Sequence, residues 1–281
     1  MIINCKEIRA KEIAKIKETY KGGCKVAFIQ VGKNEASNVY VRNKIKLCKE
    51  VGIEVEHIQF KEIISEGELI NFIEFLNKQK EIHGIMVQLP LPRHIDEQAV
   101  INSIDAEKDI DGFTAINKGK LMIGDKDAII PCTPKGIMTI LEYQEIDLEG
   151  MNVVIVGRSN IAGKPLAQLM INKGATVTVC NSKTSKSYLI DSIYNSDIFI
   201  SAIGQANYFN YDMLENYLGH TIAIDVGINR DADGKLCGDI DKELYDEFKA
   251  VTSVPGGVGL ITVLEVIRNS IECYKRHMEK K

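Results

Sequence analysis

Short apolar runs alternate with helix-like segments along the whole chain, and this alternation limits the possible folds more than any other feature. In the first half the strand-like runs are Lys25–Val31, Ile53–Phe60 and Gly84–Leu89. In the second half they are Asn152–Val156, Thr176–Cys180, Ile198–Ala202, Thr221–Val226 and Ala250–Ser253. This pattern predicts an α/β fold of βαβ units, in which the second half forms a Rossmann-type doubly wound parallel sheet.

Local signals place helices between these runs. Glu35–Val51 reads as a helix that ends at Gly52, and Ser65 and Glu68 have the spacing of a capping box at the start of another. The last helix is expected at about Ile261–Arg276, and its apolar face could pack on either domain. A length of 281 residues suits two domains.

Composition excludes several classes of protein. Hydrophobic residues make up 45% and charged residues 26%, which is the balance of a soluble globular protein. No apolar run approaches the ~20 residues of a membrane span, and a net charge of −4 gives no support for binding nucleic acid. Seven scattered cysteines without a C-x-x-C pair, and a start that lacks the features of a signal peptide, predict a cytoplasmic protein with reduced thiols.

A glycine turn follows the run Asn152–Val156 and leads into a helical stripe. Gly157 permits a tight turn, and the free N–H groups where a helix begins attract a phosphate. The spacing is not G-x-G-x-x-G, so a purely structural turn is the alternative. Because five strand-like runs make up this half of the chain, we favour nucleotide binding.

The end of the next strand bears on which nucleotide is bound. NAD-preferring sites usually carry an acidic residue there, whereas this strand ends in Asn181, Ser182 and Lys183. Together with Arg158, these residues would suit a 2′-phosphate, so NADP is predicted. The alternative is that Lys183 is only a solvated loop charge.

Ser37, Tyr40 and Lys44 share one face of the helix predicted at Glu35–Val51. A lysine against apolar surroundings can transfer protons near neutral pH. Spacing alone favours a surface lysine that extends past a core tyrosine. Because these residues lie outside the Rossmann half, they suggest a separate substrate domain that faces the nucleotide across a cleft.

Three further segments could line the same cleft. Gln88 is a polar residue in an apolar run and needs a partner or a ligand. Asp111 precedes a glycine, where simple turn chemistry is the alternative. Val254–Gly259 is a glycine-rich loop that could approach a ligand closely or act as a hinge.

Taken together, these segments resemble the bifunctional methylenetetrahydrofolate dehydrogenase/methenyltetrahydrofolate cyclohydrolase family. The resemblance covers essentially the whole chain and rests on many motifs in family order. They are Val31-Gly32, Ser37-x-x-Tyr40-Val41-x-x-Lys44, Gly84–Pro92, Lys108–Phe113, Pro131–Gly136, Val156–Ser159, Asp225–Asn229, Gly238–Asp241 and Val254–Gly259. The resemblance favours a functional Lys44 over the surface lysine.

The resemblance implies two successive reactions of one-carbon metabolism that support purine biosynthesis. A hydride passes from 5,10-methylenetetrahydrofolate to NADP, and water then converts the methenyl product to 10-formyltetrahydrofolate. The implied catalytic residues are Lys44, Tyr40, Gln88 and Asp111. The implied cofactor-binding residues are Gly157, Arg158, Ser159, Ser182, Lys183 and Ile228. The implied substrate-binding residues are Tyr40, Gln88, Leu89, Asp111, Pro255, Gly256 and Gly257, and no metal is implied.

The resemblance also implies a domain arrangement. Residues 1–134 would form the folate-binding catalytic domain, with the terminal helix 261–281 packed on it, and residues 135–260 the NADP-binding domain. The protein would be a homodimer paired through its Rossmann domains.

Three positions depart from the family's usual pattern, which has His at the place of Asn181 and Pro at those of Ser253 and Leu260. Asn181 makes the preference for NADP less secure, and Leu260 replaces a rigid residue beside the folate site. Two other functions stay open. One is an NADP-dependent dehydrogenase of another small acid, of the shikimate type, and the other is a nucleotide sensor without catalysis.

Overall fold

The computed structural model describes residues 1–214 and 218–279, without the side chains of residues 35 and 36. The chain divides into two compact units. Unit 1 consists of Met1–Lys11 and Thr133–Thr262, and unit 2 of Glu12–Cys132 and Val263–Lys281. The domain arrangement implied by the resemblance assigns residues 1–11 to the folate-binding domain, together with the rest of residues 1–134. Residues 1–11 belong to unit 1 because Ile2 and Ile3 pair with Val251 and Thr252.

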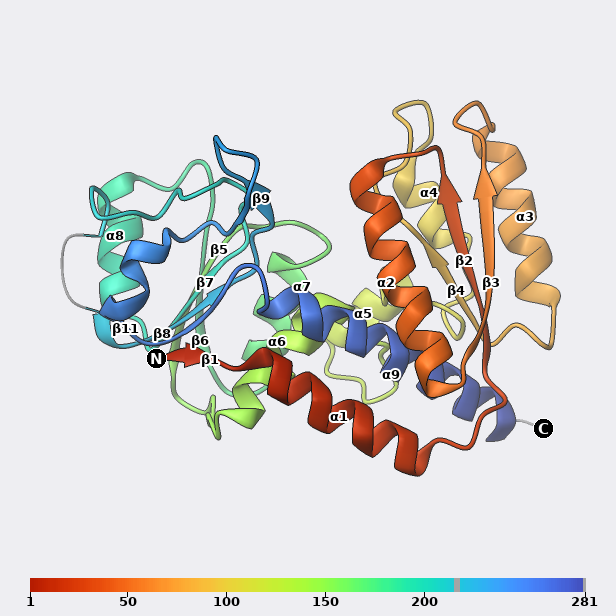
Figure 1. Ribbon diagram of the computed structural model, residues 1–281, viewed down its shortest axis with the longest axis horizontal. Coiled ribbons are helices and arrows are strands. Elements are labelled where there is room, and N and C mark those ends of the chain that lie inside the picture. The colour runs from red at the N-terminus through yellow and green to blue at the C-terminus, as the bar shows by residue number, and fades with distance from the viewer. Residues whose placement is uncertain (215–217, 280–281) are drawn as a thin grey trace. The chain divides into compact units, whose positions relative to one another are not determined.

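Unit 1 contains a parallel sheet of six strands in the described part of the chain, in the order β1-β11-β8-β7-β5-β6 (Figure 1). The strands are β1 (Ile2–Ile3), β5 (Asn152–Val156), β6 (Thr176–Cys180), β7 (Ile198–Ser201), β8 (Leu218–Asp225) and β11 (Phe248–Thr252). From β5 onward the chain first moves to the edge strand β6 and then returns past β5 to β7. Ligands of doubly wound sheets bind where the strand order reverses in this way, which here is between β5 and β7.

Helices and a small hairpin complete unit 1. They are α6 (Cys132–Tyr143), α7 (Gly163–Ile171), α8 (Lys186–Tyr194), the 3₁₀ helix η1 (Lys242–Glu247), and the antiparallel pair β9 (Asn229–Arg230) and β10 (Leu236–Cys237). The core is centred on Phe199, whose ring lies edge-on to Phe209 at 4.8 Å and is stacked on Phe248 at 6.3 Å.

Unit 2 contains a parallel sheet of three strands in the order β3-β2-β4. The strands are β2 (Lys25–Val31), β3 (Glu54–Phe60) and β4 (Gly84–Val87). The helices that begin within this part of the chain are α2 (Glu35–Val51), α3 (Glu66–Lys78), α4 (Glu97–Asn102) and α5 (Ala115–Met122). Figure 1 shows α2 and α3 on opposite sides of this sheet. Ile85 and Val87 of β4 pack with Leu69 and Ile73 of α3, so the residues between them face the α2 side.

Two helices contribute to both units. The division between the units falls after Lys11 in α1 (Cys5–Thr19) and after Thr262 in α9 (Val258–Glu279). Within unit 2 these helices are joined by Arg268, which forms ion pairs with Glu12 and with the buried Glu265.

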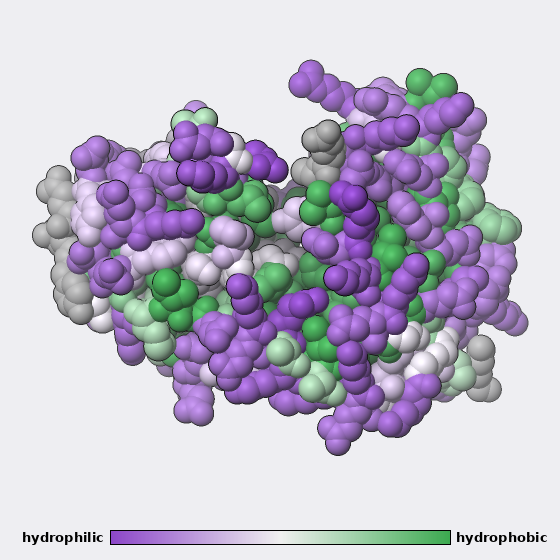
Figure 2. Space-filling model, in the orientation of Figure 1, coloured by the Kyte–Doolittle hydropathy of each residue, from purple (hydrophilic) through white to green (hydrophobic). Residues whose placement is uncertain are grey.

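Figure 2 shows hydrophilic side chains over much of the visible face. Within residues 1–214 and 218–279, no helix combines the length and the apolar character needed to cross a membrane.

The predicted α/β class is confirmed, and several elements match their predicted bounds. The helix at Glu35–Val51 ends at Gly52, whose φ is 83°, and Ser65 and Glu68 form the expected capping box. The structure corrects the last helix, which is longer than Ile261–Arg276, and the strand predicted to reach Leu89, which ends at Val87. That strand ends early because Pro90 and Pro92 cannot donate to a sheet.

Candidate active site

Helix α2 carries the first group of candidate residues. Asn34 caps the helix by accepting a hydrogen bond from the backbone of Ser37 at 3.0 Å, which fixes the first turn. Tyr40 is half-buried, and burial raises the pKa of its hydroxyl. Lys44 is only 8% exposed, so the interpretation as a surface lysine does not hold. Its ammonium group lies inside unit 2 and needs partners there.

The partners of Lys44 come from β4 and the residue that follows it. Lys44 Nζ donates to Gln88 Oε1 at 3.2 Å and to Met86 Sδ at 3.1 Å. Gln88 Nε2 donates to the carbonyl oxygen of Leu89 at 2.7 Å, which turns Oε1 toward the lysine. The predicted contact between Lys44 and Gln88 is therefore present, and Met86 is an additional partner that the sequence analysis did not identify.

Asp111 supplies a buried carboxyl group near Lys44. Burial raises its pKa to about 6, while the charge of Lys44 acts in the opposite direction and that of Asp109 adds to the increase. A carboxyl group with such a pKa is mostly ionised at neutral pH. It can therefore accept hydrogen bonds from a ligand rich in N–H donors.

A hydrogen-bond network holds the loop that carries Asp111. The carboxylate of Asp109 accepts from the backbone of Phe113 at 3.1 Å, from that of Thr114 at 2.8 Å and from Asn117 Nδ2 at 3.0 Å. On the other side, Asn269 of α9 donates to the carbonyl oxygen of Ile110 at 2.9 Å. Gly112 is required here, because a Cβ atom would lie 2.5 Å from the carbonyl oxygen of Ile129. The position of Asp111 is thus fixed by its neighbours on both sides.

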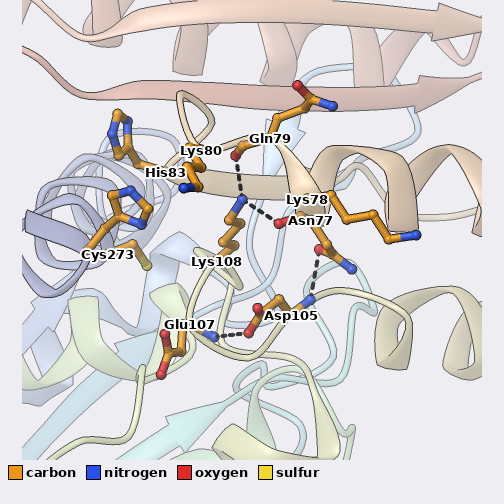
Figure 3. A pocket seen from close by; sticks show the side chains of 10 residues that line it. Asn77, Lys78, Gln79, Lys80, His83, Asp105, Glu107, Lys108 and Cys273 are labelled. Carbon is orange, nitrogen blue, oxygen red and sulfur yellow. Dashed lines mark hydrogen bonds between the residues drawn. The ribbon is translucent and has the colours of Figure 1, made fainter. Parts of the chain in front are cut away.

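Lys108 anchors the start of the same loop. Its Nζ donates to the carbonyl oxygens of Leu76 at 3.2 Å, Asn77 at 2.7 Å and Gln79 at 2.7 Å, where α3 ends (Figure 3). A cation suits the negative end of a helix. A cavity of about 180 Å³ adjoins this anchor. Its lining residues are Asn77, Lys78, Gln79, Lys80, His83, Asp105, Glu107, Lys108, Cys273 and His277, so none of Lys44, Gln88 and Asp111 borders it.

In unit 1, the predicted glycine turn follows β5 and leads into α7. Gly157 has a φ of 126°, and a Cβ atom on it would lie 2.4 Å from the carbonyl oxygen of Ala202. A Cβ atom on Gly163 would lie 2.1 Å from the carbonyl oxygen of Gly157. Helix α7 has no side-chain cap at Ala162. In its first turn Pro165 has no N–H and that of Lys164 donates to the carbonyl oxygen of Ser159 at 3.1 Å, which leaves the N–H of Gly163 for a phosphate of the predicted dinucleotide.

The residues predicted to hold the 2′-phosphate follow two paired strands. Val156 of β5 and Cys180 of β6 are register partners in a parallel pair, so the loops after them begin at the same edge. Arg158, Ser159, Ser182 and Lys183 are all exposed in these loops. Asn181 Oδ1 accepts from the backbone of Lys183 at 3.0 Å and shapes the second loop.

A pair of buried carboxylates at the ends of β8 and β10 was missed as a functional feature. Asp239 accepts hydrogen bonds from the hydroxyl of Ser201 at 2.8 Å and from the backbone of Ile203, Gly204 and Gln205. Asp225 accepts from the backbone of three residues, Gly227, Asp239 and Ile240. Burial raises the pKa of Asp225 to about 7. The pair orders the loops after β7 and β8, and the sequence signal for Asp225 is a carboxylate directly after an apolar run.

Leu89 is half-buried after β4 in unit 2, and the other remaining predicted residues lie in loops of unit 1. Ile228 is 48% exposed, and its Cδ1 lies 3.5 Å from the Cβ position of Gly259. Pro255 is exposed, and Gly257 is buried where a Cβ atom would lie 2.4 Å from the carbonyl oxygen of Ser253. The hydroxyl of Ser253 donates to the carbonyl oxygen of Pro255 at 3.3 Å. This loop needs its glycines for close packing.

Fold and site together define a class of protein. Unit 1 is a Rossmann-type sheet with a glycine turn at its switch point, and unit 2 holds a buried lysine beside an amide and a carboxylate. These are the parts of a dinucleotide-dependent enzyme with a proton-transfer group. The described part of the chain holds no group of three or more His, Cys, Asp or Glu side chains placed to bind a metal ion.

Comparison with known proteins narrows this class to one family. The catalytic-domain model of tetrahydrofolate dehydrogenase/cyclohydrolase matches residues 3–111, and the NAD(P)-binding-domain model of the same family matches residues 131–278. The chain belongs to the tetrahydrofolate dehydrogenase/cyclohydrolase family. This confirms the resemblance found in the sequence.

Individual relatives agree over nearly the whole length. The chain is 44% identical over 267 residues to the bifunctional protein FolD of Agathobacter rectalis, which covers 95% of this chain and 93% of the relative. The structure of the bifunctional FolD enzyme from Campylobacter jejuni has a TM-score of 0.92 and 40% identity, covering 98% of this chain and 99% of that one. FolD of Trypanosoma brucei, in complex with NADP and an inhibitor, has a TM-score of 0.86 and 32% identity, covering 98% and 95%.

These relatives confirm the predicted enzyme class and nucleotide cofactor. The shikimate-type alternative is not favoured, because both family models and the relatives belong to the folate enzymes.

Proposed function

We propose that this chain oxidises 5,10-methylenetetrahydrofolate with NADP and hydrolyses the 5,10-methenyl product to 10-formyltetrahydrofolate. The observation that carries the proposal is the buried contact of Lys44 with Gln88, near Asp111, in a chain that matches the folate family in both halves. A nucleotide sensor would have no use for a buried proton-transfer group.

The residues of unit 1 serve the oxidation step by binding and orienting. NADP, when bound, accepts the hydride from the folate, so the chain supplies mainly position. The turn Gly157–Gly163 and the start of α7 bind the pyrophosphate, and Ser159 and Ile228 border this site. Arg158, Ser182 and Lys183 bind the 2′-phosphate, because a guanidinium and an ammonium suit a doubly charged phosphate.

The hydrolysis step needs proton transfer, and Lys44 provides it. Water adds to the carbon of the methenyl cation and loses a proton, which leaves a hydroxyl group on that carbon. The hydroxyl group then loses its proton to form the C=O of the formyl group, while the bond from the carbon to N5 breaks and N5 gains a proton. The product carries the formyl group on N10, and one proton is released overall. Lys44 Nζ can give and take these protons, while Gln88 Oε1 at 3.2 Å holds it in place.

Folate binding is assigned to the residues that the family resemblance implied. Tyr40 packs against the aminobenzoyl ring, because its half-buried ring lies one helical turn before Lys44. The carboxylate of Asp111 accepts from the amino edge of the pterin. Leu89 and the loop residues Pro255, Gly256 and Gly257 complete the substrate contacts.

We further propose a homodimer that pairs through the Rossmann units, and a cytoplasmic location. The edge strand β6 supports the dimer, because Val179 on it and Ile171 of α7, the helix that packs on β6, are 38% and 49% exposed. An exposed strand edge with apolar neighbours is prone to pairing. All seven cysteines are free thiols, which agrees with a reducing compartment.

One assay tests the proposed function. The purified chain is mixed with 5,10-methylenetetrahydrofolate and either NADP or NAD, and the absorbance of the methenyl product and of the reduced nucleotide is followed. We expect reduction with NADP at a higher kcat/KM than with NAD, and decay of added methenyltetrahydrofolate faster than in buffer. Turnover of shikimate instead of the folate would contradict the proposal.

A further inference from the structure

The ammonium group of Lys44 has two acceptors of very different strength. Gln88 Oε1 lies at 3.2 Å and Met86 Sδ at 3.1 Å. Met86 and Gln88 are two residues apart in extended backbone, so both side chains point to the α2 side of the sheet. Met86 is completely buried, and its backbone is paired in register with that of Phe28 of β2.

A thioether is a weak hydrogen-bond acceptor, whereas an amide oxygen is a strong one. A second oxygen at this place would bind the ammonium firmly and oppose the loss of its proton. A hydrocarbon side chain would leave one N–H of a buried ammonium without an acceptor, which is costly. The sulfur is intermediate between an oxygen and a hydrocarbon as an acceptor. It orients the Nζ atom of Lys44 through a weak hydrogen bond.

From this geometry we infer that Met86 is a positioning residue for the cyclohydrolase step, which acts through its sulfur on Lys44. The inference rests on the proposed function, because it needs Lys44 to transfer protons. A buried methionine could have two roles here, packing and positioning of Lys44, and these depend on different properties of the side chain. Packing depends on the volume of the side chain, whereas positioning of Lys44 depends on the sulfur atom.

The variant Met86→Leu tests the sulfur, since leucine conserves volume and apolar character. We expect kcat of the cyclohydrolase to fall about fivefold, which corresponds to ~1 kcal/mol, with KM for methenyltetrahydrofolate within about twofold of wild type. Dehydrogenase kcat/KM should stay within about twofold. The matched control is Met170→Leu, the same change at a completely buried methionine in unit 1, which should alter neither activity.

A second measurement keeps the test valid if Met86→Leu fails to fold. Growth on norleucine replaces the sulfur of all eight methionines by CH₂ with little change in shape. We expect norleucine to lower the cyclohydrolase kcat of the wild-type sequence by the same factor. Where Met86→Leu folds, norleucine should cause no further fall in the kcat of that variant.

The inference is overturned if Met86→Leu keeps the cyclohydrolase kcat of wild type, or if both activities fall together. It is also overturned if norleucine leaves the wild-type kcat unchanged. A wild-type enzyme without any cyclohydrolase activity overturns the proposed function and this inference with it. An active wild type with an unaffected Met86→Leu overturns this inference alone.

Discussion

Lysine side chains mostly reach solvent, yet Lys44 is 8% exposed and is bound by two side chains from β4 and its end. Its spacing from Ser37 and Tyr40 showed which residues share a helix face but not what covers that face. The partners lie more than forty residues away in the sequence, and only the parallel pairing of β2 with β4 brings them together. The resemblance to a family identified Lys44 and Gln88, whereas Met86 was visible only in the structure.

Asp111 gives a pH prediction at the residue scale. Its pKa in the folded protein, about 6, lies above the ordinary value of 3.8, so the folded state holds the proton more tightly than the unfolded state. Ionisation of Asp111 therefore lowers the free energy of unfolding as pH rises through this window. We expect the free energy of unfolding of Asp111→Asn to increase by about 2 kcal/mol relative to that of wild type as the pH rises from about 4 to about 7, measured by urea unfolding. A stability difference that does not change with pH would show that Asp111 is not responsible.

Arg158 gives a prediction on cofactor choice. If its guanidinium binds the 2′-phosphate, Arg158→Ala should lower kcat/KM for NADP about tenfold or more and that for NAD by less than about twofold. The control is Lys173→Ala, an exposed cation after α7 in the same unit. Equal losses with both cofactors, or no loss with either, would contradict the binding of Arg158 to the 2′-phosphate.

At the scale of elements, local signals were sufficient where a single residue type fixes the backbone. The C-cap glycine of α2, the capping box of α3 and the turn after β5 were all predicted from the sequence. The elements that were missed lack such signals. Strand β1 has only two residues and exists because it pairs with β11, and α1 has no marked apolar stripe.

The turn between β5 and α7 gives a prediction for one element. Gly163→Ala would place a Cβ atom 2.1 Å from the carbonyl oxygen of Gly157 and must displace the turn. We expect dehydrogenase kcat/KM for NADP to fall more than about tenfold, while hydrolysis of added methenyltetrahydrofolate stays within about twofold. Gly119→Ala is the control, because that helical glycine has open space around its Cβ position. A Gly163→Ala enzyme with unchanged NADP kinetics would contradict the role of the turn.

At the scale of the whole molecule, the alternation of strands and helices predicted the α/β class and two units. The sequence could not show that α1 and α9 each contribute to both units, because the apolar pattern of a helix does not specify what the helix packs against. The roles of unit 1 as cofactor domain and unit 2 as folate domain remain our proposal.

The proposed dimer is a property of the whole molecule and can be tested at β6. Val179→Lys places a charge on the exposed edge strand and should convert a dimer to a monomer in light scattering after gel filtration. Ile63→Lys, at a residue that is 86% exposed in unit 2, should leave the dimer intact. A monomeric wild type, or a Val179→Lys dimer of unchanged stability, would exclude pairing through this edge.

The central claim is that one chain carries out both folate reactions and that Lys44 serves the second. The most direct test compares Lys44→Met with Lys46→Met, a control at an exposed lysine of the same helix, in assays of each reaction. We predict that Lys44→Met loses hydrolysis of methenyltetrahydrofolate by at least about 100-fold and keeps part of the NADP-dependent oxidation, while Lys46→Met keeps both. Hydrolysis by Lys44→Met at the wild-type rate would contradict the account.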